Sequence, residues 1–563
     1  MSIDIETYRL KAQEAIEYVF VKEYHNSLGI PMPIVKILLP DDANYSTGQY
    51  YITIDKTWQI HLNFGKLPIS YHEFQNEVKV LTRHEIEHYM CCPFDVITHF
   101  RMLKRIKDVY YKHFSHLGIN IKYACGAISN QAADIIVDTK NYYRHSKETL
   151  KSEIDWIKIG ANISACPRHC KLMFLTKEAI WKEDLGINET DPEFLKIVHQ
   201  LADSFTKNGI EDKSSFLDKV EEYAEIFFKL YVEDQKNPQQ SGQQGSQQQS
   251  GQQGSQQQSG QWGVGRPKDG DEHGNAFVFA DPDKVKEAIE VLAEETSVEE
   301  FIDLLAIAGI IGMSDKQKGV LWFNVQSANI IPIVEFSNTG NKSSYTYPSV
   351  WRIGDPIEEL DLMLTYMTSP RLIPGMTTKK WEYVSNDDNG TESKQMDLLL
   401  VVDTSGSMGS AMKESANMHQ AVLASYGILS YFESTKSKVA FIGFSDKIDA
   451  YVDWSDKYDD VRERLLTNGH GGTKFPISRI KSTLDVRSRD LVTVLITDGD
   501  LGNINESVSY FRDYLNDDNK LYIFLLVGSK SLHSYEPLKN IGAKIYNANN
   551  ANEFCDMVLT DME

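Results

Sequence analysis

Apolar runs and amphipathic stretches alternate along the last third of the chain. Apolar runs of roughly four to eight residues are typical of buried strands, and stretches that are apolar on one helical face are typical of helices covering a sheet. The predicted strands are 397–402, 438–444, 491–497 and 520–527, and the predicted helices include 414–433, 458–466, 504–515 and 551–559. This alternation predicts an α/β domain with a doubly wound, Rossmann-like sheet.

The earlier part of the chain has a different pattern. Residues 1–28 form a charged amphipathic pattern that predicts a helix, and residues 58–64 read as a strand. A helical pattern runs from 281 to 311 and begins at an Asp-Pro start signal. A strand-like run at 330–336 and a helical run at 356–367 follow it, so this middle region mixes both kinds of element.

The clearest boundary is a stretch of low complexity. From residue 239 to 261 the chain contains only Gln, Ser and Gly, and one nine-residue sequence begins at Ser241 and again at Ser250. Such a segment cannot bury enough apolar area to offset its chain entropy, so we expect a flexible tether. The predicted organisation is a first domain at 1–234, a linker at 235–275, an intermediate region at 276–393 and a closing α/β domain at 394–563.

The size, net charge and apolar segments of the chain indicate which partners and which cellular location to expect. The chain has 563 residues, of which 41% are hydrophobic, and this is enough for several packed domains. Its net charge of −22 argues against nucleic acid or an anionic membrane as the main partner. We recognise no secretory signal pattern, no apolar run of about 18 residues and no evenly spaced disulfide framework. We therefore expect a cytoplasmic protein.

Polar residues follow two of the predicted strands. Asp403, Ser405 and Ser407 come directly after the first strand, and Asp498 comes directly after the third. The carboxyl ends of such strands are where α/β sheets bind ligands, and a carboxylate with two hydroxyls in one turn can face a hard cation. Thr473, in an intervening Gly-Gly-Thr loop, adds a further oxygen. The sequence therefore predicts a Mg²⁺ site.

At these positions the closing domain resembles a von Willebrand factor A (VWA) domain with its metal-ion-dependent adhesion site. The whole family pattern is matched, at Asp403, Ser405, Ser407, Thr473 and Asp498. The resemblance covers roughly the last third of the chain. It implies a Mg²⁺ ion whose oxygen shell is completed by an acidic residue of a protein partner.

The first half contains a second candidate site. Residues 84–88 read His-Glu-Ile-Glu-His within a helical pattern, so His84 and His88 lie on one helix face and can share a Zn²⁺. Glu85 is adjacent and is placed to accept a proton from a water molecule at the metal. The strand predicted at 58–64 lies just upstream, where metallopeptidases keep the edge strand that pairs with a substrate backbone.

Zinc requires a third protein ligand. Asp134 and Asp138 are four residues apart on another predicted helix, so both carboxylates face one way. One can bind the metal while the other accepts the free N–H of a histidine. We favour Asp134 as the ligand and Asp138 as the acceptor. The alternatives for the third ligand are His99, His113 and His116.

This second site resembles that of the gluzincin metallopeptidases, with Asp134 where that family has glutamate. The longer metzincin pattern is not matched, because Cys91 and Phe94 stand where its glycine and third histidine belong. The Ala-Ala-Asp stretch ending at Asp134 is also similar to that of bacterial metallopeptidase-like proteins with a C-terminal VWA-like domain. That resemblance implies a zincin-like α+β first domain, a protein or peptide substrate, and a MoxR-type AAA+ ATPase as partner.

Two functions are compatible with these patterns. The leading hypothesis is a zinc-dependent, peptidase-like protein whose VWA domain binds Mg²⁺ and recruits the ATPase. The alternative is a non-catalytic adaptor, in which the VWA domain couples an AAA+ ATPase to client proteins and the first-half metal is structural or absent. The chain has no Gly-x4-Gly-Lys-Ser/Thr phosphate-binding loop, so either function leaves ATP hydrolysis to the partner.

Overall fold

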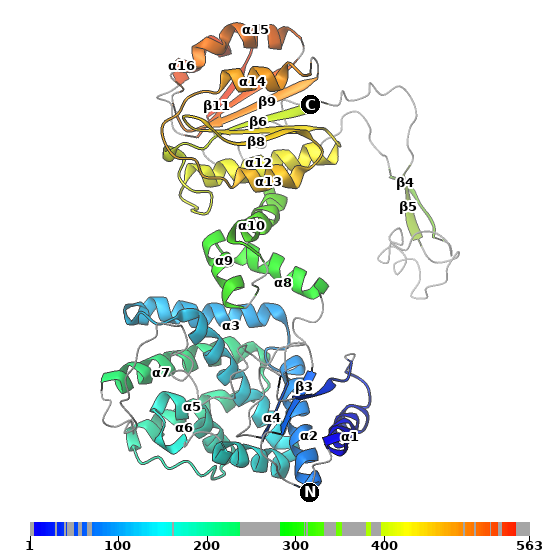
Figure 1. The fold of residues 1–563 in the computed structure, drawn as a ribbon, viewed down its shortest axis with the longest axis vertical. Helices are drawn as coiled ribbons and strands as arrows, with labels where there is room; N and C mark the ends of the chain where they lie inside the picture. The colour runs from blue at the N-terminus through cyan, green and yellow to red at the C-terminus, as the bar shows by residue number, and fades with distance from the viewer. Residues whose placement is uncertain are drawn as a thin grey trace. The chain divides into compact units, whose positions relative to one another are not determined.

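The computed structural model divides into two compact units, Met1–Lys318 and Gly319–Glu563 (Figure 1). It describes residues 5–28, 31–38, 41, 50–54, 59–64, 70–159, 163–236, 282–308, 310, 313–330, 345–351, 379–383, 396–487, 490–499, 501, 503–517, 519–526 and 532–547. The predicted tether, most of the strand-like run at 330–336 and the helices predicted at 356–367 and 551–559 lie outside the described residues. The domain boundaries drawn from the sequence stay predictions.

The first unit contains a three-stranded sheet. Its strands are β1 (Ile34–Leu38), β2 (Tyr50–Ile54) and β3 (Gln59–Phe64), in the order β1-β3-β2. β3 pairs in parallel with β1 and antiparallel with β2. The expectation that the strand at 58–64 is an edge strand is therefore wrong, because strands that the pattern did not reveal occupy both of its sides. The edge strand that contacts α2 (Tyr71–Met90) is β2.

Helices form the remainder of the described first unit. They are α1 (Ile5–Glu17), α2, α3 (Val96–Val109), α4 (Ile121–Ile159), α5 (Arg168–Trp181), α6 (Pro192–Thr206), α7 (Phe216–Lys236), α8 (Pro282–Glu295) and α9 (Val298–Ile307), with short turns at Tyr18–Glu23, Tyr110–Phe114, Ser115–Leu117, Ile163–Ala165 and Lys213–Ser215. α4 changes direction at His145, where the backbone is not helical. α2, α3, α5 and α7 all pack against α4. None of the helices in the described ranges combines the length and the apolar character needed to cross a membrane.

The helical pattern at 281–311 is two helices rather than one. The first ends at Glu295, and Ser297 caps the second, since its hydroxyl accepts the Glu300 N–H at 3.2 Å. α8 packs against α3, and α9 packs against both α3 and α4. α10 (Asp315–Ile330) then spans the division between the two units.

The second unit is an α/β structure with a six-stranded mixed sheet. Its strands are β6 (Asp397–Asp403), β7 (Val439–Phe444), β8 (Ile448–Ser455), β9 (Leu491–Thr497), β10 (Lys520–Leu525) and β11 (Lys544–Asn547), in the order β11-β10-β9-β6-β7-β8. All neighbours are parallel except β8, which runs antiparallel to β7. The four predicted strands are present as β6, β7, β9 and β10. Strand order reverses between β6 and β9, which is where such sheets form ligand sites.

Helices cover both faces of this sheet (Figure 1). α12 (Asn417–Ser434) and α13 (Tyr458–Leu465) lie on one face; α14 (Ile477–Leu484), α15 (Val508–Asn516) and α16 (Leu532–Lys539) lie on the other. Leu399 and Val401 of β6 join a core cluster with residues of α14, α15 and α16. Short helical turns lie after β6, at Gly406–Met408, and after β9, at Ile504–Ser507. In a separate two-stranded sheet, β4 (Tyr345–Val350) pairs with β5 (Lys379–Tyr383).

Candidate metal centres

Helix α2 carries the first candidate site. A capping box fixes its start, because the Ser70 hydroxyl accepts the Glu73 N–H and the Glu73 carboxylate accepts the Ser70 N–H. Toward its other end, His84, Glu85 and His88 are only 4%, 4% and 1% exposed. Polar side chains buried to this degree are stable only with suitable partners, so their surroundings indicate their roles.

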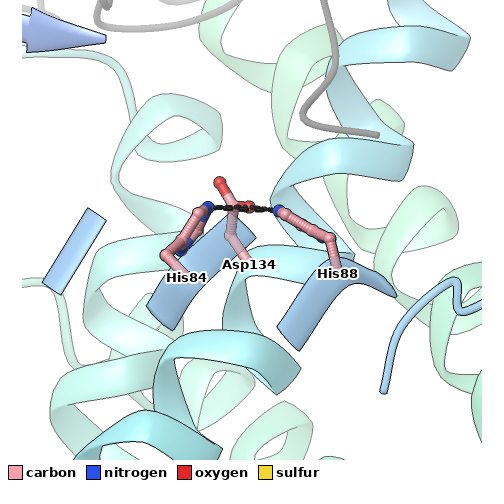
Figure 2. A group of neighbouring side chains, drawn as sticks. All are labelled: His84, His88 and Asp134. Carbon is pink, nitrogen blue, oxygen red and sulfur yellow. Dashed lines mark hydrogen bonds and ion pairs between the residues drawn. The ribbon is translucent and has the colours of Figure 1, made fainter. Parts of the chain in front are cut away.

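His84, His88 and Asp134 of α4 converge on one point (Figure 2). The two histidine Nε2 atoms are 3.1 Å apart, and Asp134 Oδ1 lies 3.5 Å from His84 Nε2 and 3.3 Å from His88 Nε2. Two ligands about 2.0 Å from a tetrahedral Zn²⁺ are about 3.3 Å from each other. The three separations therefore fit one zinc ion. Within the described residues, no second group of three His, Cys, Asp or Glu side chains is gathered in this way.

The Nδ1 atom of each histidine forms a hydrogen bond with an oxygen atom. His84 Nδ1 donates to Asp138 Oδ1 at 2.6 Å, and His88 Nδ1 donates to the Cys92 carbonyl at 2.9 Å. With these protons on Nδ1, each Nε2 directs a lone pair toward Asp134 Oδ1. The other oxygen of Asp134 accepts from Asn130 Nδ2 at 3.0 Å. Three electron-pair donors that face one another are stabilised by a cation, so the donor set fits a metal.

Asp138 occupies the accepting position expected for it, and a buried lysine fixes it there. Lys177 Nζ lies 2.6 Å from Asp138 Oδ2. Burial alone would raise the pKa of the Asp138 carboxyl, but Lys177 and His84 outweigh burial and hold this pKa well below its usual range. Asp138 is thus an ionised acceptor for His84.

The two glutamates of the motif have different surroundings. Glu87 is fully buried, and its carboxylate contacts Lys140 Nζ at 2.7 Å and Arg144 Nη1 at 2.9 Å and accepts from the Tyr24 hydroxyl at 3.0 Å. The contacts with Lys140 and Arg144 connect α2 to α4, so the Glu87 carboxylate is engaged in packing interactions. The Glu85 carboxylate, by contrast, forms no hydrogen bond or ion pair with another described residue. Of the two motif glutamates, Glu85 is thus the one whose carboxylate is not engaged by another described residue.

The alternative third ligands are not in this group. His99 is buried on α3, and His113 and His116 are exposed in the turns that follow α3. In the part of the chain that the structure describes, the convergent donors are His84, His88 and Asp134. Helix spacing favoured Asp134 in the sequence, and the packing of α4 against α2 is what brings its carboxylate beside the two histidines.

The second candidate site lies at the carboxyl edge of the six-stranded sheet. β6 and β9 are in parallel register, so the loops that follow them emerge side by side. Asp403 ends β6, and its Oδ1 accepts the Ser405 N–H at 2.9 Å. This bond turns the chain back and places the Ser405 and Ser407 hydroxyls 3.1 Å apart.

The later loops reach the same turn. Ser407 Oγ donates to Asp498 Oδ1 at 3.0 Å, so direct hydrogen bonds connect four of the five residues expected at the site. The fifth, Thr473, lies two residues after Gly471, whose carbonyl accepts the Gly406 N–H at 3.3 Å. The structure thus brings the Thr473 loop against the turn that follows Asp403.

The charges at this edge also favour a cation. Burial raises the pKa of Asp403 above its usual value, and the nearby Asp498 carboxylate adds to the rise, whereas hydrogen bonds from Thr497 and Ser405 oppose it. A divalent ion would relieve both the burial of one carboxylate and its repulsion by the other. Two carboxylates with several hydroxyls are oxygen donors of the kind that Mg²⁺ binds.

Sequence reasoning missed the residues that hold the candidate ligands in place. Thr497 Oγ1 donates to Asp403 Oδ2 at 2.6 Å, and Asn417 Nδ2 donates to Asp498 Oδ2 at 3.1 Å. Thr497 directly precedes Asp498, so its position was a usable signal. Asn417 begins α12 and Lys177 lies on α5, and only the fold brings either of them to its site.

Gly469 lies beside the Asp403 turn and leaves no room for a side chain. A Cβ there would be 2.3 Å from Asp449 Oδ2 and 2.5 Å from the Thr404 carbonyl oxygen. Asp449 Oδ2 accepts from Thr404 Oγ1 at 2.7 Å and would lose that bond on moving, and the other close atom belongs to the backbone. We expect Gly469→Ala to lower the free energy of unfolding by about 1–3 kcal/mol in urea denaturation.

Gly472 is the matched control for this substitution. A Cβ at Gly472 has nothing within 4 Å, so Gly472→Ala should change stability by less than about 0.5 kcal/mol. Equal denaturation midpoints for the two variants would contradict the packing described around Gly469.

No protein-family model matches the chain, and no curated protein sequence matches it. A conserved hypothetical protein, BatB from Bacteroides thetaiotaomicron, aligns with a TM-score of 0.25 and 12% identity over 30% of this chain and 97% of its own. An aerotolerance-related membrane protein from Bacteroides fragilis aligns with a TM-score of 0.24 and 14% sequence identity. The alignment covers 30% of this chain and 98% of that protein. The pilus adhesin SpaC from Lactobacillus rhamnosus aligns with a TM-score of 0.25 and 14% sequence identity over 30% of each chain. Similarity at this level assigns neither a family nor a function.

Proposed function

We propose that this chain is a zinc-dependent, peptidase-like protein of the cytoplasm whose VWA domain binds Mg²⁺ and recruits a protein partner, a MoxR-type AAA+ ATPase. In this proposal the first unit is zincin-like and the second unit contains the VWA domain. The observation that carries the proposal is the buried group of His84, His88 and Asp134, whose separations suit one tetrahedral ion.

The residues around this group support hydrolysis of a peptide bond. A bound Zn²⁺ would polarise the substrate carbonyl and lower the pKa of a water molecule. His84, His88 and Asp134 would hold the ion, while Asp138 keeps the lone pair of His84 turned inward. Glu85 would accept a proton from water and later deliver it to the leaving amine. The edge strand β2, which contacts α2, would pair with an extended substrate backbone.

The second site supports partner binding rather than catalysis. Asp403, Ser405, Ser407, Thr473 and Asp498 would hold Mg²⁺, and a carboxylate of the partner would complete its oxygen shell. Asp498 is half-buried and Ser407 is exposed, so a partner can approach this edge of the sheet.

Peptide cleavage by the purified protein tests the proposed function. Zinc-loaded protein incubated with a mixed peptide library is expected to give cleavage products in mass spectrometry, and a zinc chelator is expected to abolish them. Zinc that binds without any cleavage would remove the peptidase activity from the proposal and leave the adaptor function.

A further inference from the structure

Lys177 is a buried cation close to the zinc group. Its side chain is 2% exposed, and its Nζ lies 2.6 Å from Asp138 Oδ2 and 2.8 Å from Glu153 Oε1. A buried ammonium is stable only when it is paired and hydrogen-bonded. Both of its partners belong to α4, although Lys177 itself lies on α5.

The two carboxylates belong to different halves of α4. Asp138 and Glu153 are 15 residues apart in the sequence, which is about 22 Å along a straight helix. One ammonium could not contact both if α4 were straight. The helix changes direction at His145, with φ −135° and ψ 48°, and this bend brings both carboxylates to Lys177. Lys177 therefore connects the half of α4 that carries Asp134 and Asp138 to the half that carries Glu153.

Lys177 is connected to the proposed zinc ligand His84 through one intermediate residue, Asp138. Asp138 uses Oδ2 for Lys177 and Oδ1 for His84 Nδ1, so each of its oxygens has a different partner. With both oxygens engaged, the carboxylate plane cannot rotate freely. His84 Nδ1 is then held in one direction, which fixes where His84 Nε2 points.

We infer that Lys177 is a positioning residue of the zinc group: it fixes Asp138, and through Asp138 it fixes the ring of His84. The inference rests on the proposed zinc site. The ion pairs of Lys177 in the described residues are with Asp138 and Glu153, so it reaches the proposed ligand His84 through Asp138. Glu153 holds the other side of the ammonium and keeps Lys177 in reach of Asp138.

Lys177→Met tests this role because it keeps an unbranched apolar side chain and removes the cation. Asp138 Oδ2 then loses its donor and the carboxylate is free to turn. We expect the dissociation constant for Zn²⁺, measured by chelator competition, to rise about 10–100-fold. The visible absorption of the Co²⁺-loaded protein should also change, because that spectrum reports ligand geometry.

Lys171→Met is the matched control. Lys171 lies on the same helix, is also buried, and pairs with Glu189 at 2.9 Å rather than with Asp138. Its replacement should leave zinc affinity and the Co²⁺ spectrum unchanged, even though it also breaks an ion pair. Equal losses of zinc affinity in the two variants would overturn the inference, since general destabilisation would then account for both.

Two further results separate this inference from the proposed function. Wild-type protein that binds zinc, beside a folded Lys177→Met variant with equal affinity and an unchanged Co²⁺ spectrum, would overturn the inference alone. Wild-type protein that binds no zinc would overturn the proposed zinc site and the inference with it. If Lys177→Met does not fold, Glu153→Gln decides: a several-fold loss of zinc affinity supports the inference, and unchanged affinity overturns it.

Discussion

Glu85→Gln is expected to slow peptide cleavage at least about 100-fold while leaving zinc bound. The substitution keeps the size of the side chain and removes the group that would accept and deliver a proton. General acid–base groups contribute about 10²–10⁴-fold to rate, so cleavage should fall by that factor. Glu85 is not among the convergent donors, so zinc content should stay at the wild-type level. Cleavage rate and zinc content measured on the same preparation check both parts.

Glu87→Gln is the control, because it changes the neighbouring glutamate of the same motif. Glu87 is engaged by Lys140, Arg144 and Tyr24, so its replacement should lower stability by about 1–3 kcal/mol and leave most of the cleavage activity. A Glu85→Gln protein that cleaves at the wild-type rate would contradict the assigned role of Glu85. If the Glu85→Gln protein also keeps its metal and all cellular function, the adaptor hypothesis is favoured.

Asp403→Ala is expected to remove Mg²⁺ binding from the second unit. Asp403 is fully buried at the end of β6, and its carboxylate anchors the turn that presents Ser405 and Ser407. Loss of this proposed ligand should raise the dissociation constant for Mg²⁺ at least about 100-fold, more than the loss of a residue that only supports a ligand. Calorimetric titration of the protein with Mg²⁺ measures the change.

Two variants make that result specific. Ser407→Ala removes one hydroxyl and its bond to Asp498, so a smaller loss of Mg²⁺ affinity is expected without disturbance of the buried turn. Asp453→Ala removes an exposed carboxylate of β8 that bonds Tyr451, and Mg²⁺ affinity should not change. Tight Mg²⁺ binding by Asp403→Ala would show that the ion lies elsewhere.

The strands that could be predicted are those buried on both faces. Such strands read as continuous apolar runs, and β6 and β9 are of this kind. β8 and β11 were missed because both are edge strands with partly exposed, mixed residues. The position of β3 was misjudged for a related reason, since its two neighbours carry no clear pattern of their own.

The candidate sites were predictable where the residues repeat at helix spacing or directly follow a strand. His84, His88 and Asp134 meet because each lies on a regular helix, and the two helices pack together. Lys177 and Asn417 could not be predicted, because each comes from an element whose sequence carries no sign of the site. Supporting residues of this kind depend on tertiary packing, which a local pattern does not encode.

Zinc content is the measurement that tests the central claim most directly. Wild-type protein and Asp134→Ala would be equilibrated with Zn²⁺, freed of excess metal and analysed by elemental mass spectrometry. We expect about one zinc per chain in the wild type, as one tetrahedral site requires, and almost none in Asp134→Ala. Wild-type protein without zinc, or an Asp134→Ala variant that retains it fully, would contradict the site formed by His84, His88 and Asp134.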